Sequence, residues 1–308
     1  MTPVRPVLEP IVVALGRVDL WSAALAGFLV RGGVLLFLLP IVWLPSPLDL
    51  ANLFGSAVTS AALGGPNPDL VRLVVLAAVA TGLLLVVAFW LGALMDVAVV
   101  RIGARSLGSP ADAAEALDPG ADAPGLGEAR TAFAARLLAF APLGVALAVA
   151  APAVVAATYG ELVDPSTLTV PLVLRVLGDL PFIVALLLGT WLIGDAIGGL
   201  AVRRAVLDGR GAVSALGAAI GLVARRPLAA LATLVAGTAV IVALVAPALL
   251  ASAVVWRAVL FASRGDAGPV LSGLGIVALA ALWLGGLVLA GFATAVRALL
   301  WSAFATPR

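Results

Sequence analysis

The chain has 308 residues, of which 63% are hydrophobic and only 11% are charged. Soluble domains are nearer about half apolar and a quarter charged, so this composition excludes a soluble fold and predicts a protein that folds in lipid. All 18 basic residues are arginine, the net charge is only +2, and no arginine cluster is interleaved with aromatic residues, which excludes a nucleic-acid-binding surface.

The first part of the chain predicts a short helix followed by a spanning hairpin. Residues 5–18 have the amphipathic pattern of a helix that lies in the membrane interface. A spanning helix is expected over about 20–44 and a longer one over about 69–106. Residues 48–69 between them are expected to form a loop with one short surface helix.

The middle of the chain predicts a second hairpin. Residues 107–127 are acidic and rich in proline and glycine, which is typical of a surface loop. A third helix is expected over about 127–158 and a fourth over about 171–207. The fourth helix is expected to break near Gly178, because Pro181 favours a new helix start.

The last part predicts the same pattern again. Residues 212–224 form a second interfacial helix, a fifth helix runs to about residue 262 with Pro247 inside it, and a sixth covers about 269–305. The predicted fold class is therefore all-α: a polytopic membrane protein with six transmembrane helices, arranged as three helical hairpins with short interfacial helices.

Two recurring features suggest that the three hairpins are repeats within one membrane domain, residues 1–308. Each third of the chain carries an arginine followed 22 or 23 residues later by a proline. The pairs are Arg17 and Pro40, Arg130 and Pro152, and Arg225 and Pro247. Trp-Leu segments recur on the even-numbered helices, at 90–91, 191–192 and 283–284. The predicted repeat units are about 1–108, 109–210 and 211–308.

Arginine placement predicts the orientation. With the N-terminus in the cytoplasm, thirteen arginines fall on the cytoplasmic side and four on the other, while Arg31 is left inside the first helix. Arg136, Arg203 and Arg297 are among the thirteen. Heavy use of Ala, Val, Leu, Gly and Arg is typical of a GC-rich bacterial genome. We therefore expect a multi-pass protein of the bacterial cytoplasmic (inner) membrane with both termini in the cytoplasm.

Three ionisable residues lie within apolar segments that are predicted to be helical, and these residues form the candidate site. Arg31 lies 12 residues after Asp19, about 18 Å into the first helix and near the middle of a ~30 Å hydrocarbon core. Asp96 lies nine residues before Arg105, and Asp195 lies eight residues before Arg203. An arginine facing lipid at such depth is costly. We therefore predict that Arg31 faces the bundle interior and pairs with Asp96, Asp195 or both.

The aspartates allow more than one interpretation. They are either structural partners of arginine or hydroxyl groups, or sites of proton or cation coupling. Two intramembrane aspartates and the Pro-Ala-Leu text at 247–249 also suggest an aspartyl protease resembling presenilin. The Gly-x-Gly-Asp motif of such proteases is missing, because residues 192–195 are Leu-Ile-Gly-Asp.

Other signals of chemistry are absent from the sequence. Without cysteine there is no disulfide, thiolate nucleophile or cysteine metal site, and without histidine the commonest metal ligand and general base are missing. No phosphate loop, serine elbow or dinucleotide fingerprint occurs. We therefore expect a protein that is not an enzyme, with no catalytic residues, no metal site and no cofactor.

Glycine and tryptophan suggest where helices pack. The Gly194-x-x-x-Gly198 spacing favours close contact inside the protein, and Gly217-x-x-x-Gly221 has the same spacing. Four tryptophans near predicted helix ends are expected to anchor in the interface: Trp21, Trp43, Trp256 and Trp301. Three deeper ones are expected to pack between hairpins: Trp90, Trp191 and Trp283.

An interfacial helix before a spanning hairpin, and a sequence such as AVRRAVLDGRGAVSAL at 201–216 between hairpins, resemble a broad class of bacterial six-helix membrane proteins. The chain is also similar in layout to the membrane domain fused to some glycerophosphodiester phosphodiesterases. No catalytic residues carry over from that resemblance, because the hydrolase domain of those fusions has no counterpart in this sequence.

Two function classes follow. The first is a non-enzymatic membrane component, permease-like or an accessory subunit of a larger assembly, which contacts lipid and works with a membrane-protein partner or as a homo-oligomer. The second is a small self-contained transporter that couples through Asp96 and Asp195.

Overall fold

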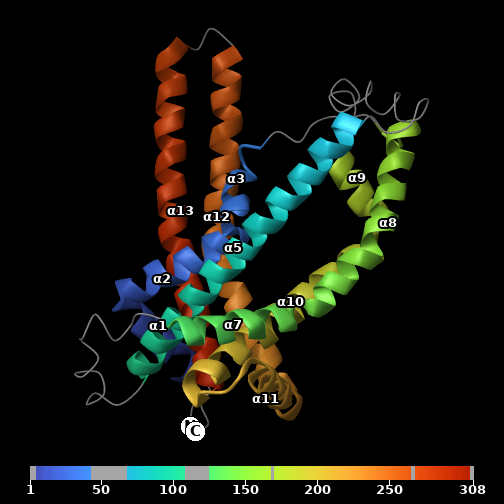
Figure 1. Ribbon diagram of the computed structural model, residues 1–308. Coiled ribbons are helices and arrows are strands. Elements are labelled where there is room, and N and C mark those ends of the chain that lie inside the picture. Colours follow the sequence, from blue (N-terminus) through green and yellow to red (C-terminus); the bar gives the residue numbers. More distant parts are fainter. Residues whose placement is uncertain (1–4, 43–67, 108–124, 168–169, 265–267, 306–308) are drawn as a thin grey trace. The chain divides into compact units, whose positions relative to one another are not determined.

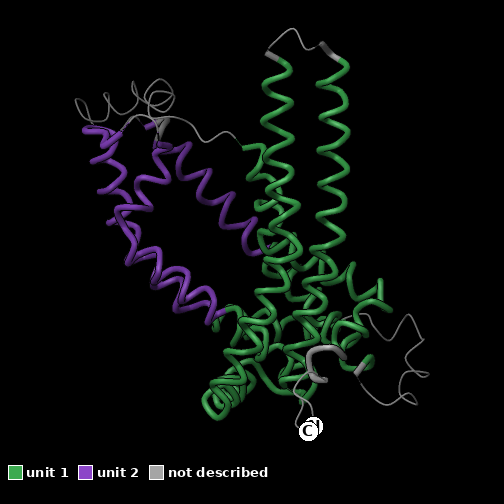
Figure 2. Tube along the Cα trace, turned by 180° about the vertical axis from the view of Figure 1, so that it is seen from behind, with its two compact units in different colours: residues 1–42, 88–139, 195–308 green, residues 43–87, 140–194 purple. Residues whose placement is uncertain are grey.

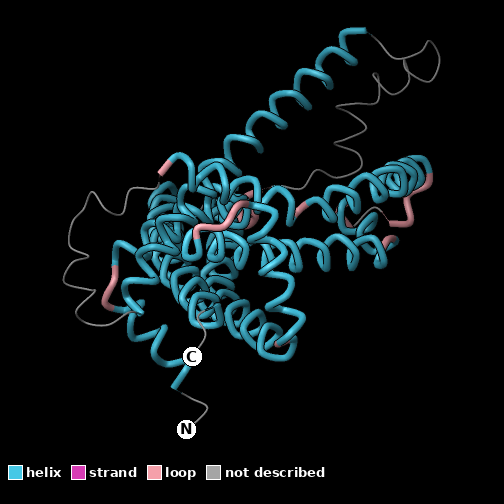
Figure 3. Tube along the Cα trace, turned by 60° about the horizontal axis from the view of Figure 1, so that its bottom comes forward, coloured by secondary structure: helices cyan, strands magenta, loops and turns pink. Residues whose placement is uncertain are grey.

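A computed structural model of the protein describes residues 5–42, 68–107, 125–167, 170–264 and 268–305. All regular secondary structure in these ranges is helical (Figure 1, Figure 3). Six helical segments are long and apolar enough to cross a membrane, as predicted. They are Val18–Leu38, Val71–Ser106, Ala141–Val163, Pro181–Asp208, Pro227–Ser263 and Val270–Ala305. The expected loops at 48–69 and 107–127 fall almost entirely outside the described residues.

The chain divides into two compact units, which Figure 2 colours separately. Unit 1 contains residues 1–42, 88–139 and 195–308, and unit 2 contains residues 43–87 and 140–194. These boundaries do not coincide with those of the predicted repeats. Arg31, Asp96 and Asp195 all belong to unit 1.

Unit 1 is built on an antiparallel hairpin of two long helices, α12 (Pro227–Arg264) and α13 (Gly268–Ala305), which lie side by side (Figure 1). Two shorter helices, α1 (Arg5–Leu15) and α2 (Val18–Phe28), pack against α13. The indole Nε1 of Trp21 on α2 donates a hydrogen bond to the carbonyl of Ala14 at 2.6 Å. This bond closes the corner between α1 and α2.

The first spanning segment is not the continuous helix over 20–44 that the sequence predicts. After α2 come a π-helical turn, η1 (Leu29–Gly33), and a short helix, α3 (Val34–Leu38). Gly32 has φ 100°, a backbone conformation that favours glycine, and Arg31 has ψ 17°. The Arg31-Gly32 pair therefore breaks the helix. Pro40 lies in the turn that follows α3 rather than inside a helix.

The third predicted helix, over 127–158, is also divided in two. α7 (Leu126–Ala139) ends before Phe140, and α8 (Ala141–Val163) starts directly after it. Pro142 lies in the first turn of α8, where a proline needs no backbone hydrogen bond. This proline favours a new helix start, which the apolar pattern alone does not reveal. α7 belongs to unit 1 and α8 to unit 2.

The remaining elements follow the prediction closely. α5 (Pro68–Leu107) covers the second predicted helix. The fourth is broken as expected, into α9 (Leu172–Asp179) and α10 (Pro181–Asp208). α11 (Ala212–Arg225) is the predicted short helix and packs against α7 in unit 1. Both α5 and α10 contribute residues to each unit.

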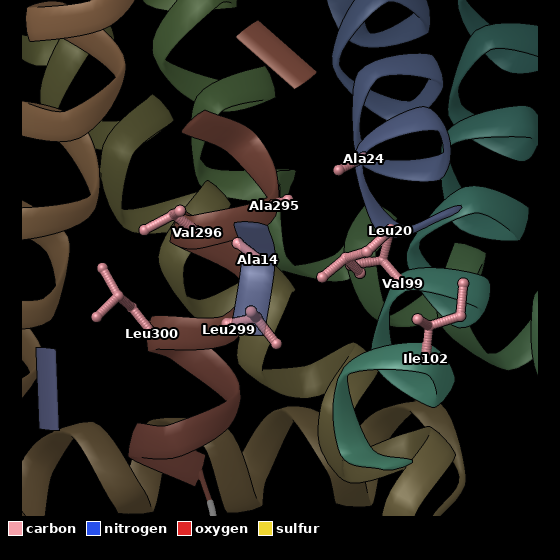
Figure 4. Packing of buried hydrophobic residues seen from close by; sticks show 9 residues of the cluster. All are labelled: Ala14, Leu20, Ala24, Val99, Ile102, Ala295, Val296, Leu299 and Leu300. Carbon is pink, nitrogen blue, oxygen red and sulfur yellow. The ribbon is translucent and has the colours of Figure 1, made fainter. Parts of the chain in front are cut away.

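Small side chains dominate the core of unit 1. The cluster in Figure 4 consists of Ala14, Leu20, Ala24, Val99, Ile102, Ala295, Val296, Leu299 and Leu300. Alanine lets helix backbones approach closely, which replaces the hydrophobic drive that helices lack in lipid. The cluster joins α1 and α2 to the ends of α5 and α13, and this packing positions the polar residues nearby.

The tryptophans only partly follow the prediction. Trp301, expected in the interface, is 5% exposed and stacks edge-on against Phe304. Trp90 packs edge-on against Phe133 of α7, with ring centroids 5.8 Å apart. Trp191 is 45% exposed. Trp301 is buried because α13 continues past it into a packed cluster with α7, α10 and α11.

Candidate functional site

Five charged side chains form a linear series of ion pairs inside unit 1, which we call the charge chain. Arg31 Nη1 lies 2.6 Å from Asp96 Oδ1, and Arg136 Nε lies 2.5 Å from Asp96 Oδ2. Arg136 Nη1 lies 3.2 Å from Asp195 Oδ1, and Arg297 Nη2 lies 2.5 Å from Asp195 Oδ2. Positive and negative charges alternate along the chain, and all four aspartate oxygens accept a hydrogen bond from an arginine.

Each member of the charge chain comes from a different element. Arg31 lies in η1, Asp96 in α5, Arg136 in α7, Asp195 in α10 and Arg297 in α13. The series therefore joins helices that are far apart in the sequence. Arg31 lies at η1, the break within the first spanning segment.

Glycines make room for the arginine at the first end. A Cβ atom added at Gly27 would lie 3.2 Å from Arg31 Nη2, and one at Gly92 would lie 3.3 Å from Arg31 Cγ. Both distances are tighter than ordinary van der Waals contact. The Arg31 side chain therefore occupies space that is free because Gly27 and Gly92 have no side chain.

Glycine also allows close contact at Arg297 and at α7, the helix that carries Arg136. A Cβ atom at Gly237 of α12 would lie 2.8 Å from Arg297 Cγ, and one at Gly198 would lie 3.3 Å from Ala139 Cβ of α7. Gly198 thus packs inside the protein, as the Gly194-x-x-x-Gly198 spacing predicts. Gly217 and Gly221 have nothing within 4 Å of an added Cβ atom, so the second spacing makes no comparable contact in the described structure.

Burial is greatest at the centre of the charge chain and least at its ends. The side chain of Arg136 is 7% exposed, that of Asp96 12%, and that of Arg31 31%. Burial by itself lowers the pKa of the Arg136 guanidinium, but the carboxylates of Asp96 and Asp195 raise it by more, so the pKa lies above its ordinary value. Arg136 is thus a permanent cation held between two anions.

Arg203 of α10 is buried, like Arg136, and lies beside the charge chain. Its Nε lies 3.1 Å from Ser302 Oγ, its Nη1 2.8 Å from the Gly199 carbonyl, and its Nη2 2.7 Å from the Ala298 carbonyl. All of these acceptors are neutral. Arg203 fixes α10 to the end of α13 without cancelling any charge.

The structure brings the three predicted residues into one cluster, but only one of the predicted pairs forms directly. Arg31 contacts Asp96, whereas Asp195 is joined to Asp96 through Arg136. The arginine bias predicts Arg136, Arg203 and Arg297 at the cytoplasmic face, but it does not predict that Arg136 and Arg203 are buried. The apolar residues that flank these arginines are the only signal of burial in the sequence. The partners of the arginines lie on distant helices, so no local pattern reveals them.

The geometry does not resemble a catalytic aspartate pair. Such a pair shares a proton or a water between two carboxylates, but here the Arg136 guanidinium binds an oxygen of each and lies between them. Within the described ranges, no group of three or more His, Cys, Asp or Glu side chains could hold a metal ion.

Unit 2 contains a separate buried ion pair, for which the sequence carries no distinguishing pattern. Glu161 of α8 pairs with Arg175 of α9, and Glu161 also accepts a hydrogen bond from the backbone N–H of Ser166 at 3.2 Å. The pair joins α8 to α9 across the intervening turn.

Comparison with protein-family models, with curated proteins and with solved structures finds no match. The function must therefore be inferred from the residues of this chain.

Proposed function

We propose that the protein is a non-enzymatic component of the bacterial cytoplasmic membrane, permease-like or an accessory subunit of a larger assembly, with both termini in the cytoplasm. One observation carries this proposal: both oxygens of Asp96 and both oxygens of Asp195 are bound by arginine. Each carboxylate oxygen of the charge chain already faces an arginine cation, which disfavours the binding of a substrate cation there.

The same observation argues against the transporter alternative. A coupling site needs a carboxylate that can release its partner and take up a proton or cation. Arginine cannot give up its own proton within a protein. Separating the ion pairs of the charge chain would also leave buried charges without partners, which is strongly unfavourable. The charge chain therefore acts as a clamp on the helices of unit 1.

The order of the elements supports the proposed threefold repeat, with units of about 1–108, 109–210 and 211–308. The short helices α1, α7 and α11, of 11, 14 and 14 residues, each precede a spanning segment. Pro152 and Pro247 lie inside α8 and α12, as the repeat requires, whereas Pro40 does not lie inside a helix. This layout is also the basis of the proposed similarity to the membrane domain of some glycerophosphodiester phosphodiesterases.

The clamp and the transporter predict opposite behaviour for Asp96→Asn and Asp195→Asn. If the carboxylates clamp the helices, each variant should lower the thermal unfolding midpoint in detergent, and wild-type proteoliposomes should show no proton flux above that of empty vesicles. Wild-type proton flux that disappears in variants of unchanged thermal stability would establish the transporter instead.

The accessory role predicts a stable association. Cross-linking in the native membrane, followed by purification in mild detergent and mass spectrometry, should recover the chain in a fixed ratio with a second integral membrane protein or with further copies of itself. Recovery only as a monomer, without a partner in fixed ratio, would contradict this role.

A further inference from the structure

The polar cluster of unit 1, which includes the buried Arg136 and Arg203, carries more positive than negative charge. It contains Arg31, Arg136, Arg203 and Arg297 but only two acidic residues, Asp96 and Asp195, which leaves a formal excess of two positive charges. Arg203 finds only neutral acceptors. Uncompensated charge away from water is costly, so the cluster favours an anion that the described residues do not supply.

One member of the cluster has a donor ready for such an anion. The Nε atom of Arg297 is buried and has no hydrogen-bond partner among the described residues, although Nη2 of the same side chain binds Asp195. The Arg297 side chain is 20% exposed, so part of it can be reached from outside. Its stem lies against Gly237, where any larger residue would displace it.

The length of α12 places this donor at a membrane surface. Trp256 and Arg257 are the pair of residue types that mark an interface, and Arg257 is exposed. From Arg257 to Gly237 is 20 residues. At the helical rise this is about 30 Å, the thickness of the hydrocarbon core. If Arg257 lies at one surface of the membrane, Gly237 lies at the other. The Arg297 stem lies against Gly237 and is therefore at the level of the lipid phosphates of that second surface.

We propose that the Arg297 end of the charge chain binds a phosphate group, with the headgroup phosphate of an anionic phospholipid as the favoured source. The guanidinium N–H groups of Arg297 that do not bind Asp195 would donate to the phosphate oxygens, the recognition for which arginine is suited. The bound anion would reduce the charge excess contributed by Arg203 and the charge chain. This site is independent of the function proposed above.

The test is lipid-dependent stabilisation of the full chain in a maltoside detergent, whose headgroup contains no phosphate. Thermal unfolding is followed by tryptophan fluorescence while dioleoylphosphatidylglycerol, dioleoylglycerol or inorganic phosphate is titrated, and an apparent Kd is taken from the stabilisation. Dioleoylglycerol has the same acyl chains without the phosphate. Arg297→Gln removes the charge, and Arg297→Lys keeps a cation for Asp195 but lacks Nε–H. Arg257→Gln is the matched control at the other end of the hairpin.

We expect dioleoylphosphatidylglycerol, but not dioleoylglycerol, to stabilise the wild type. Both Arg297 variants should weaken the apparent Kd by about tenfold or more, as expected for loss of a hydrogen bond to a charged group, while Arg257→Gln should match the wild type. Equal stabilisation by inorganic phosphate with the same dependence on Arg297 would assign the site to a soluble phosphate. The proposal is overturned if the wild type is not stabilised by either phosphate compound, if dioleoylglycerol acts as well, or if the Arg297 variants bind like the wild type.

Discussion

At the scale of single residues, Arg136 is the centre of unit 1. It is the only member of the charge chain that contacts both aspartates, and its side chain is the most buried of the five. Arg31 contacts Asp96 alone, from the more exposed end. The two arginines should therefore differ in their contribution to stability.

Arg136→Leu should destabilise the protein by about 3–5 kcal/mol, because it leaves two buried carboxylates each short of a partner. Arg31→Leu should cost less, because Asp96 keeps Arg136. The free energy of unfolding in detergent measures both, with exposed Arg257→Leu as the control, expected within about 0.5 kcal/mol of the wild type. An Arg31→Leu loss as large as that of Arg136→Leu would contradict the order proposed for the charge chain.

Coupling between Arg31 and Asp96 can be measured separately. The Arg31→Leu/Asp96→Leu double variant should lose less stability than the sum of the two single losses, because the pair is removed together. Thermal unfolding of the two singles and the double gives the interaction energy. Fully additive losses would mean that the two side chains are uncoupled.

Gly32 gives a test of the break beside Arg31. Its φ of 100° disfavours any residue with a Cβ atom, so Gly32→Ala should destabilise by about 1–2 kcal/mol. Gly217→Ala is the control, since Gly217 lies within α11 with nothing near an added Cβ atom and should be neutral or slightly stabilised. If the two substitutions have equal effects, the break does not depend on glycine.

At the scale of elements, the α12–α13 hairpin holds its end of the charge chain through one close approach. Gly237 of α12 lies under the stem of Arg297 of α13, and an added Cβ atom would come within 2.8 Å of Cγ. Here the close neighbour is a charged side chain, and its position decides whether Asp195 keeps its second arginine partner beside Arg136.

Gly237→Val should therefore destabilise the protein by about 1–3 kcal/mol, the usual range for overpacking. In an Arg297→Ala background the Arg297 side chain is absent, so there is nothing for the new valine to displace. Gly237→Val should then lower the stability much less than it does in the wild type. Gly285→Val on α13 is the control, because nothing lies within 4 Å of a Cβ atom there. Thermal unfolding of these variants in detergent would contradict the close approach if Gly237→Val and Gly285→Val behaved alike.

At the scale of the whole molecule, six apolar helices fit a multi-pass membrane protein, and the arginine bias predicts its orientation. Reporter fusions after residues 62 and 164 should behave as external, and fusions after residues 118 and 210 as cytoplasmic. An alkaline phosphatase reporter, active only outside the cytoplasm, distinguishes the two. A cytoplasmic signal at residue 62 or 164 would show that the proposed topology is wrong.

The amino-acid sequence alone predicts the fold class and most helix boundaries of this protein. Long apolar runs can satisfy their backbone in lipid only as helices, so α5, α12 and α13 follow directly from composition and length. The high cost of a charge in lipid also marks Arg31, Asp96 and Asp195 as unusual and predicts that Arg31 pairs with Asp96, Asp195 or both.

Only the tertiary structure decided which charges meet. The break at Arg31 depends on the conformation of Gly32, which apolar periodicity does not report. The sequence pattern predicts Arg136 at a membrane surface. In the structure, α7 is a helix separate from α8 and packs with α5 and α10, which buries Arg136. An ion pair forms between side chains on distant segments, so its members are fixed by packing, and local sequence can show that a charge needs a partner without showing which one it finds.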